Sequence, residues 1–175
     1  MVPKVVGSRP IIRPKFMTKN ERDIFVLQTV QPGLAGLMDG SVSTLAPIFA
    51  AAFATRSSHT AFLIGVAAAV GAGISMAFAE ALSDDGSLTG RGHPLRRGVI
   101  IGVMTFLGGI FHTIPFLIAN FHTAVSIAFI VVGLELITIA YIRYHYFKMR
   151  FWLSALQVVF GGGLVFAAGI LIGSS

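Results

Sequence analysis

The chain has 175 residues, enough for one domain, and its composition is unusual: 55% of the residues are hydrophobic and only 11% are charged. Because a soluble domain carries roughly 25% charged residues, this balance and a mean hydropathy of +0.83 exclude an ordinary soluble protein. The sequence contains no cysteine, which excludes thiolate metal sites, disulfides and thiol catalysis.

Residues 1–23 contain several prolines and basic residues, but no early apolar run of the length that a signal peptide needs. We expect them to form a basic cytoplasmic tail ahead of a transmembrane domain over residues 24–175. Near the end of this tail, Thr18 and Glu21 have the spacing of a capping box, which predicts the start of a helix.

The apolar residues 24–30 follow that capping box and allow two interpretations. They form either a short helix in the membrane interface, broken at Pro32-Gly33, or the first part of a longer membrane span.

A bilayer crossing needs about 20 mostly apolar residues, and five stretches of the chain satisfy this requirement. They are residues 34–54, 58–82, 98–118, 122–142 and 151–173. The sequence therefore predicts an all-α integral membrane protein with five transmembrane helices. Three pairs of glycines have the four-residue spacing that lets membrane helices approach closely. These pairs are Gly36/Gly40, Gly98/Gly102 and Gly169/Gly173.

The basic residues predict the orientation of the spans, because lysine and arginine accumulate on the cytoplasmic side. Of the 13, only Arg56 falls on one side of the predicted membrane, and the others fall on the opposite side: Lys4, Arg9, Arg13, Lys15, Lys19, Arg22, Arg91, Arg96, Arg97, Arg143, Lys148 and Arg150. We expect the N-terminus in the cytoplasm and the C-terminus outside. The net charge of +6 then forms a collar that attracts anionic lipid headgroups, and no nucleic-acid partner is expected.

Three acidic residues fall inside predicted spans: Asp39, Glu80 and Glu135. A mid-membrane aspartate costs about 2.5–3.5 kcal/mol even on the lenient insertion scale, so such residues usually mark ion or proton paths. With a rise of 1.5 Å per residue, the three acids lie about 7, 3 and 10 Å from the cytoplasmic ends of their spans. We expect them to line one polar path in the cytoplasmic half of the membrane.

Helical spacing places two further residues, Ser43 and Met76, on the same helix faces as these acids. Ser43 lies one turn beyond Asp39, and Pro47 leaves the carbonyl of Ser43 without its usual helical partner. Met76 lies one turn deeper than Glu80 on the same face. Carboxylate, carbonyl and thioether groups together suit a partly dehydrated first-row divalent metal ion.

Other polar residues are weaker candidates. His112, in the third predicted span, is a possible exit-side relay for a proton or metal. Asp84 and Asp85, with His93, are a possible cytoplasmic metal-capture point. Each candidate also has a purely structural interpretation: Glu80 at the membrane interface, Met76 in ordinary packing, Glu135 and His112 in hydrogen bonds, and the two aspartates in a solvated turn.

Two segments resemble motifs of the vacuolar iron transporter family. Met38-Asp39-Gly40-Ser41-Val42-Ser43-Thr44-Leu45 is similar to its first-helix signature, and Gly73-Ile74-Ser75-Met76-Ala77-Phe78-Ala79-Glu80 to its second-helix segment. The resemblance covers roughly residues 33–173. Within the family, the membrane half of bacterial membrane-bound ferritins is the most similar, through residues 79–86 and 90–92.

This resemblance implies a homodimeric transporter, not an enzyme, that moves Fe²⁺, and Mn²⁺ as a second substrate, out of the cytosol in exchange for protons. It implies that Asp39 and Met76 line the path, with Glu80 at the matching glutamate. No bound cofactor is implied, and the membrane is expected to be a bacterial inner membrane. Residues 83–97 are too short and basic for the family's acidic metal-collecting insertion, and this sequence has a short basic tail where membrane-bound ferritins carry a ferritin-like domain. We therefore expect metal to reach the path either without a dedicated collector or from a separate partner or a missing segment.

Two alternatives to transport follow from the same residues. The chain is either a membrane anchor or assembly platform for a ferritin-like iron-storage partner, or an intramembrane haem enzyme. The buried acids disfavour an anchor, which does not need them. The sequence disfavours a haem enzyme. Haem held between helices needs two histidines deep in the predicted spans, and only His112 lies there.

Overall fold

The computed structural model describes residues 18–83, 86 and 89–174, and these residues form helices and connecting turns without a strand. The elements are α1 (Lys19–Phe25), the π-helical segment η2 (Val26–Val30), α2 (Gln31–Ser43), α3 (Leu45–Thr55), α4 (Ser58–Ala81), α5 (Pro94–Phe111), the 3₁₀ turn η3 (Ile114–Leu117), α6 (Phe121–Phe147) and α7 (Phe151–Gly173). Five helical units are long and apolar enough to cross a membrane, which confirms the predicted number.

The first span is one nearly continuous helical unit over Lys19–Thr55. Its start has the predicted capping box, since Thr18 Oγ1 accepts from the N–H of Glu21 and the Glu21 carboxylate accepts from the N–H of Thr18. Pro32 stands in the first turn of α2, where its missing N–H is tolerated, so the helix is not broken there. The longer span, and not the short interfacial helix, is therefore the correct interpretation.

The break in this span lies at Thr44, between α2 and α3. The N–H of Thr44 turns to the carbonyl of Val42 instead of continuing the α-helical pattern. Pro47 stands in the first turn of α3 and cannot donate a backbone hydrogen bond, which accounts for an interruption one turn before it.

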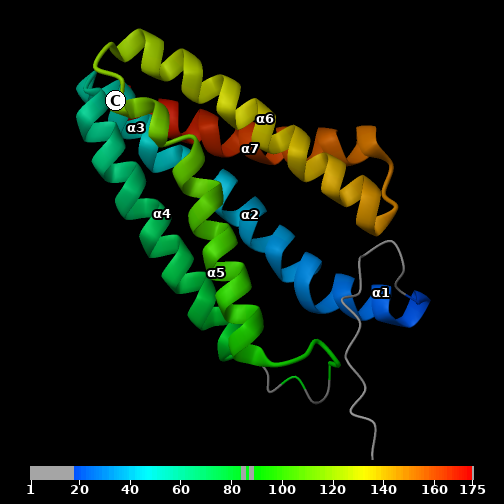
Figure 1. Cartoon of the computed structure of the whole chain (residues 1–175). Helices are drawn as coiled ribbons and strands as arrows, with labels where there is room; N and C mark the ends of the chain where they lie inside the picture. Colours follow the sequence, from blue (N-terminus) through cyan, green and yellow to red (C-terminus); the bar gives the residue numbers. More distant parts are fainter. Residues whose placement is uncertain (1–17, 84–85, 87–88, 175) are drawn as a thin grey trace, which may run out of the picture.

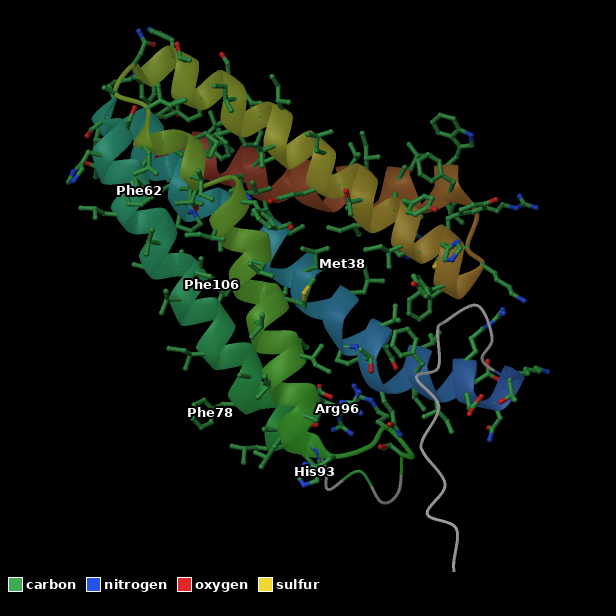
Figure 2. All side chains as sticks on the ribbon, viewed as in Figure 1. Met38, Phe62, Phe78, His93, Arg96 and Phe106 are labelled. Atoms are coloured by element: carbon green, nitrogen blue, oxygen red, sulfur yellow. The ribbon has the colours of Figure 1, made fainter. Side chains whose placement is uncertain are left out.

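The helices pack around α5, α2 and α3 (Figure 1). α5 lies between α4 and α2, while α3 packs against α7 and α4, and α6 runs beside α7. We call the end of the bundle that carries α1, the α4–α5 connection and the α6–α7 connection the basic end, and the opposite end the Arg56 end. His93 and Arg96 lie at the basic end, as Figure 2 shows.

Close helix contacts occur at all three predicted glycine pairs. A Cβ atom at Gly36 or Gly40 would overlap the carbonyls of Ile101 and Thr105 on α5. A Cβ atom at Gly98 or Gly102 would overlap atoms of α4 in the same way. A Cβ atom at Gly169 or Gly173 would overlap the backbone of Ala46 or Ala50 in α3. The missing side chains therefore let α5 and α3 approach their neighbours at backbone distance.

Large apolar side chains cover the outside of the bundle, notably on α4, α6 and α7. Phe78 of α4, for example, is 64% exposed and projects away from the helices (Figure 2). Such a surface is costly in water and suits hydrocarbon, as the composition requires. The buried interior instead holds a core around Leu45, Ile48 and Phe49 of α3.

Two span boundaries differ from the prediction. α6 continues to Phe147, five residues past the predicted end, because its last turns carry aromatic and basic residues that a hydropathy scan places outside the membrane. α5 begins at Pro94 and ends at Phe111, before the predicted end at residue 118, and the chain then turns through η3.

The close approach at Gly36 predicts the effect of adding one methyl group there. Gly36→Ala must displace the Ile101 backbone, and overpacking of this kind costs about 1–3 kcal/mol, more than the roughly 1 kcal/mol that alanine adds to helix propensity. We expect a lower melting temperature in detergent. Gly133→Ala is the control, because open space surrounds Gly133, and its melting temperature should be unchanged or higher. Equal melting of both variants would contradict the packing described.

Candidate functional site

Asp39 is half-buried on α2 and has neither a hydrogen bond nor an ion pair with any residue of the described ranges. Helical spacing puts it on the side of α2 opposite Leu37 and Ser41, which are buried. Its carboxylate is thus within the first span, close to its middle, and not locked to a fixed cation.

The two residues predicted to accompany Asp39 lie on exposed or half-exposed positions. Ser43 is exposed one turn further along α2, on the same side as Asp39. Met76 is half-buried on α4, one turn from Gly73, which contacts α5. Within the described part of a single chain, no three histidine, aspartate or glutamate side chains come close enough together to hold a metal ion.

Glu80, in the last turn of α4, is engaged by two arginines. Its Oε1 lies 2.8 Å from Nε of Arg97 and 2.8 Å from Nη2 of Arg91. The Arg97 side chain is only 1% exposed and also donates from Nη1 to the carbonyl of Gly92. An arginine buried at this depth is compensated chiefly by the carboxylate, so the cluster closes the basic end between α4 and α5.

A second buried cluster links three helices near the middle of the bundle. His112 Nε2 lies 2.8 Å from Thr44 Oγ1, and His112 Nδ1 lies 3.0 Å from Glu135 Oε2. The exposed fractions of Thr44, His112 and Glu135 are 1%, 0% and 7%. We call these three residues the Thr44–His112–Glu135 chain. It connects the break after α2, the end of α5 and the middle of α6.

Further polar contacts complete this cluster. Thr44 Oγ1 lies 2.8 Å from the carbonyl oxygen of Gly40, the residue after Asp39. Ser41 lies beside the Glu135 carboxyl group, but Ser41 Oγ and Glu135 Oε1 make no hydrogen bond of good geometry with described residues. The series of hydrogen bonds therefore begins at the carbonyl oxygen of Gly40, next to Asp39, and ends at the Glu135 carboxyl group, whose Oε1 has no hydrogen bond with the described residues.

Because α6 extends to Phe147, Glu135 lies 12 residues from the end of that helix, about 18 Å along its axis, whereas the distance to the predicted span end is about 10 Å. His112 is the C-cap residue of α5 and not a mid-helix residue as predicted, since the helix ends at Phe111.

Glu135 also borders an apolar pocket between α2, α5, η3 and α6. The pocket has a volume of about 790 Å³, and its other lining residues are uncharged. Its walls include Leu37, Met104 and Pro115. The carboxyl group thus sits at the inner wall of a mostly hydrocarbon-lined space.

The predicted cytoplasmic capture point falls mostly outside the described residues. Asp84 and Asp85 lie outside the described ranges. His93 caps the N-terminus of α5, where its Nδ1 accepts from the N–H of Leu95 at 3.3 Å.

Sequence reasoning missed four residues of these clusters: Thr44, Ser41, Arg91 and Arg97. The two arginines were counted only with the basic collar, and the position of Arg97 beside Arg96, before the third predicted span, is no signal of burial. Thr44 and Ser41 are neutral, and nothing in their spacing distinguishes them from the other hydroxyl residues of a membrane helix.

The Glu80 cluster generates a stability prediction. Glu80→Gln removes the carboxylate beside the buried Arg97 charge, and breaking a buried pair in this way costs about 3 kcal/mol. Thermal denaturation in detergent should occur at a clearly lower temperature, and Arg97→Met in the same chain should restore part of the loss. The control is Arg96→Gln, whose side chain is exposed and contacts Thr29 Oγ1 at 3.3 Å, and which should melt like the wild type. Wild-type melting of Glu80→Gln would contradict the assignment.

Comparison with known proteins gives one match, to a family model. No curated protein and no solved structure matched the chain. The sequence model of the VIT family matches residues 82–174, which span α5, α6 and α7 and include both His112 and Glu135. This match covers more than half of the chain, although it does not include Asp39 or Met76. The chain belongs to the VIT family, whose members are membrane metal ion transporters.

Proposed function

We propose that this chain exports divalent metal, Fe²⁺ and also Mn²⁺, from the cytosol in exchange for protons, and that Asp39 is its central metal ligand. The observation that carries the proposal is the state of the three acids within the spans. Glu80 has arginine partners and Glu135 has a histidine partner, whereas Asp39 has no cationic partner among the described residues. A carboxylate within a membrane span that has no cationic partner in its own chain is a candidate binding site for a metal cation.

The position of Asp39 favours a site shared between two copies of the chain. Its side of α2 is not covered by the other helices, because the residues on that side, Ala35 and Ser43, are exposed. A homodimer joined through this side would bring two Asp39 carboxylates to one ion. Two carboxylates neutralise the charge of a divalent ion, which lowers the cost of holding it between apolar helices.

The residues predicted to accompany Asp39 suit a first-row metal. Met76 supplies a thioether, a softer ligand that favours Fe²⁺ over Mg²⁺ or Ca²⁺, and Ser43 supplies a hydroxyl oxygen. In this proposal the basic end faces the cytoplasm, so Glu80 lies at the entrance, where an arriving cation competes with Arg91 and Arg97 for the carboxylate.

Proton exchange follows from the chemistry of such a site. A carboxylate binds metal only when deprotonated, so protons arriving from the acidic side of the membrane displace the ion there. We place the protein in a bacterial cytoplasmic membrane, with a separate ferritin-like protein as a possible source of iron on the cytoplasmic side.

The test is metal flux in proteoliposomes with a matched pair of aspartate variants. Asp39→Asn keeps the size of the side chain but removes its charge, so we expect Mn²⁺ and Fe²⁺ flux to be lost while the protein still inserts and dimerises. Asp23→Asn is the control, because Asp23 is exposed in α1, and it should transport like the wild type.

Two results would contradict the proposal. Full transport by Asp39→Asn would remove the residue from the mechanism. An absence of flux in the wild type, together with co-purification of a ferritin-like protein, would instead support a membrane anchor.

A further inference from the structure

The Thr44–His112–Glu135 chain has the features of a site for one exchangeable proton. This inference rests on the proposed exchange of metal for protons and concerns residues that the metal site does not need. An acid and a base lie 3.0 Å apart inside the bundle, with exposed fractions of 7% and 0%. A purely structural hydrogen bond in this position would be made at lower cost by uncharged groups.

Counting hydrogens shows that two protonation states fit the same positions of the heavy atoms. In the first, the Thr44 hydroxyl donates to His112 Nε2, and Nδ1–H donates to an ionised Glu135. The imidazole is then neutral and the pair has a charge of −1.

In the second state the pair holds one more proton. Nε2–H donates to Thr44 Oγ1, and the hydroxyl hydrogen of Thr44 turns to the carbonyl of Gly40. The added proton is the one on Nε2, one proton remains between His112 Nδ1 and Glu135 Oε2 as in the first state, and the pair is neutral overall. Both contacts of Thr44 Oγ1 measure 2.8 Å, so either direction of donation is satisfied.

Few other charges act on this pair. The described part of α7 contains no ionisable residue, and α4 carries only His59 and Glu80, near its opposite ends. On α2 the nearest ionisable group is Asp39, and on α5 the arginines Arg96 and Arg97 lie at the far end from His112. On α6 itself the other ionisable residues, His122 and those within 141–146, lie toward the two ends of the helix. A proton that enters the pair therefore changes the charge of a region with few other ionisable groups.

We propose that His112 and Glu135 form the proton-binding site of this transporter, separate from the metal site at Asp39, and that the Thr44 hydroxyl links the two. When the pair is protonated, Thr44 donates to the Gly40 carbonyl; when it is deprotonated, that hydrogen bond is given up for His112. Gly40 follows Asp39 directly, and Thr44 lies at the break between α2 and α3. The occupancy of one site thus alters the backbone beside the other.

The apolar pocket beside Glu135 does not carry this inference, because nothing in the structure identifies what covers it. The free Oε1 of Glu135 is the atom from which a proton would leave the pair or reach it. Glu135 is one of the residues that line that pocket, on the side of α2 away from Asp39.

The link is tested by a matched pair of threonine variants in proteoliposomes. Thr44 and Thr105 are both buried, and each hydroxyl lies 2.8 Å from the carbonyl four residues earlier, but only Thr44 contacts His112. We expect Thr44→Val to retain Mn²⁺ flux without a pH gradient and to lose the stimulation that an opposing pH gradient gives the wild type. Thr105→Val should keep that stimulation. Stimulation retained in Thr44→Val would overturn the link.

The proton site itself is tested by a measurement that does not depend on transport. Difference infrared spectra of the purified protein between acidic and alkaline buffer should contain a protonated-carboxyl band that disappears in Glu135→Gln and persists in Asp39→Asn. His112→Gln should shift this band. A spectrum in which Glu135→Gln loses nothing would overturn the proposal, even if metal flux is found. Conversely, a wild type without flux but with the Glu135 band would overturn the proposed transport and leave the proton site standing.

Discussion

A charge inside a bilayer must be matched by an opposite charge or by strong hydrogen bonds, and this requirement organises the whole molecule. Glu80 is matched by Arg97 and Arg91 at the basic end, and Glu135 by His112 in the middle of the bundle. Within the described residues, the Asp39 carboxylate has neither a cationic partner nor a hydrogen bond. The first two acids therefore stabilise a single copy, whereas we propose that the third is matched from outside that copy, by a metal ion and a second copy.

The glycine contacts determine where these groups meet. Because Gly36 and Gly40 admit the backbone of α5, and Gly98 and Gly102 admit that of α4, α5 is held between the two helices that carry Asp39 and Met76. α5 then ends at Phe111, so that His112 turns toward Thr44 and Glu135 at the break in the first span. The proposed metal path and the proposed proton site are thus positioned by the same helix, which provides a physical basis for coupling them.

Much of this arrangement follows from the sequence alone. The five apolar stretches, the capping box at Thr18 and the three glycine pairs each depend on local spacing, and the structure confirms all of them. The pairing of His112 with Glu135 depends instead on where α5 stops and on a turn of η3, which no local pattern specifies. The burial of Arg97 was equally unpredictable, because an arginine near a span end usually reaches the interface.

The central claim is that a divalent ion binds at Asp39 and not at the two acids that already have partners. The most direct measurement is a crystal structure of the protein grown with Mn²⁺, in which the ion is located by its anomalous scattering. Our account predicts an anomalous peak within coordinating distance of the Asp39 carboxylate, between two copies of the chain. A peak beside Glu80 or Glu135, with none at Asp39, would contradict it.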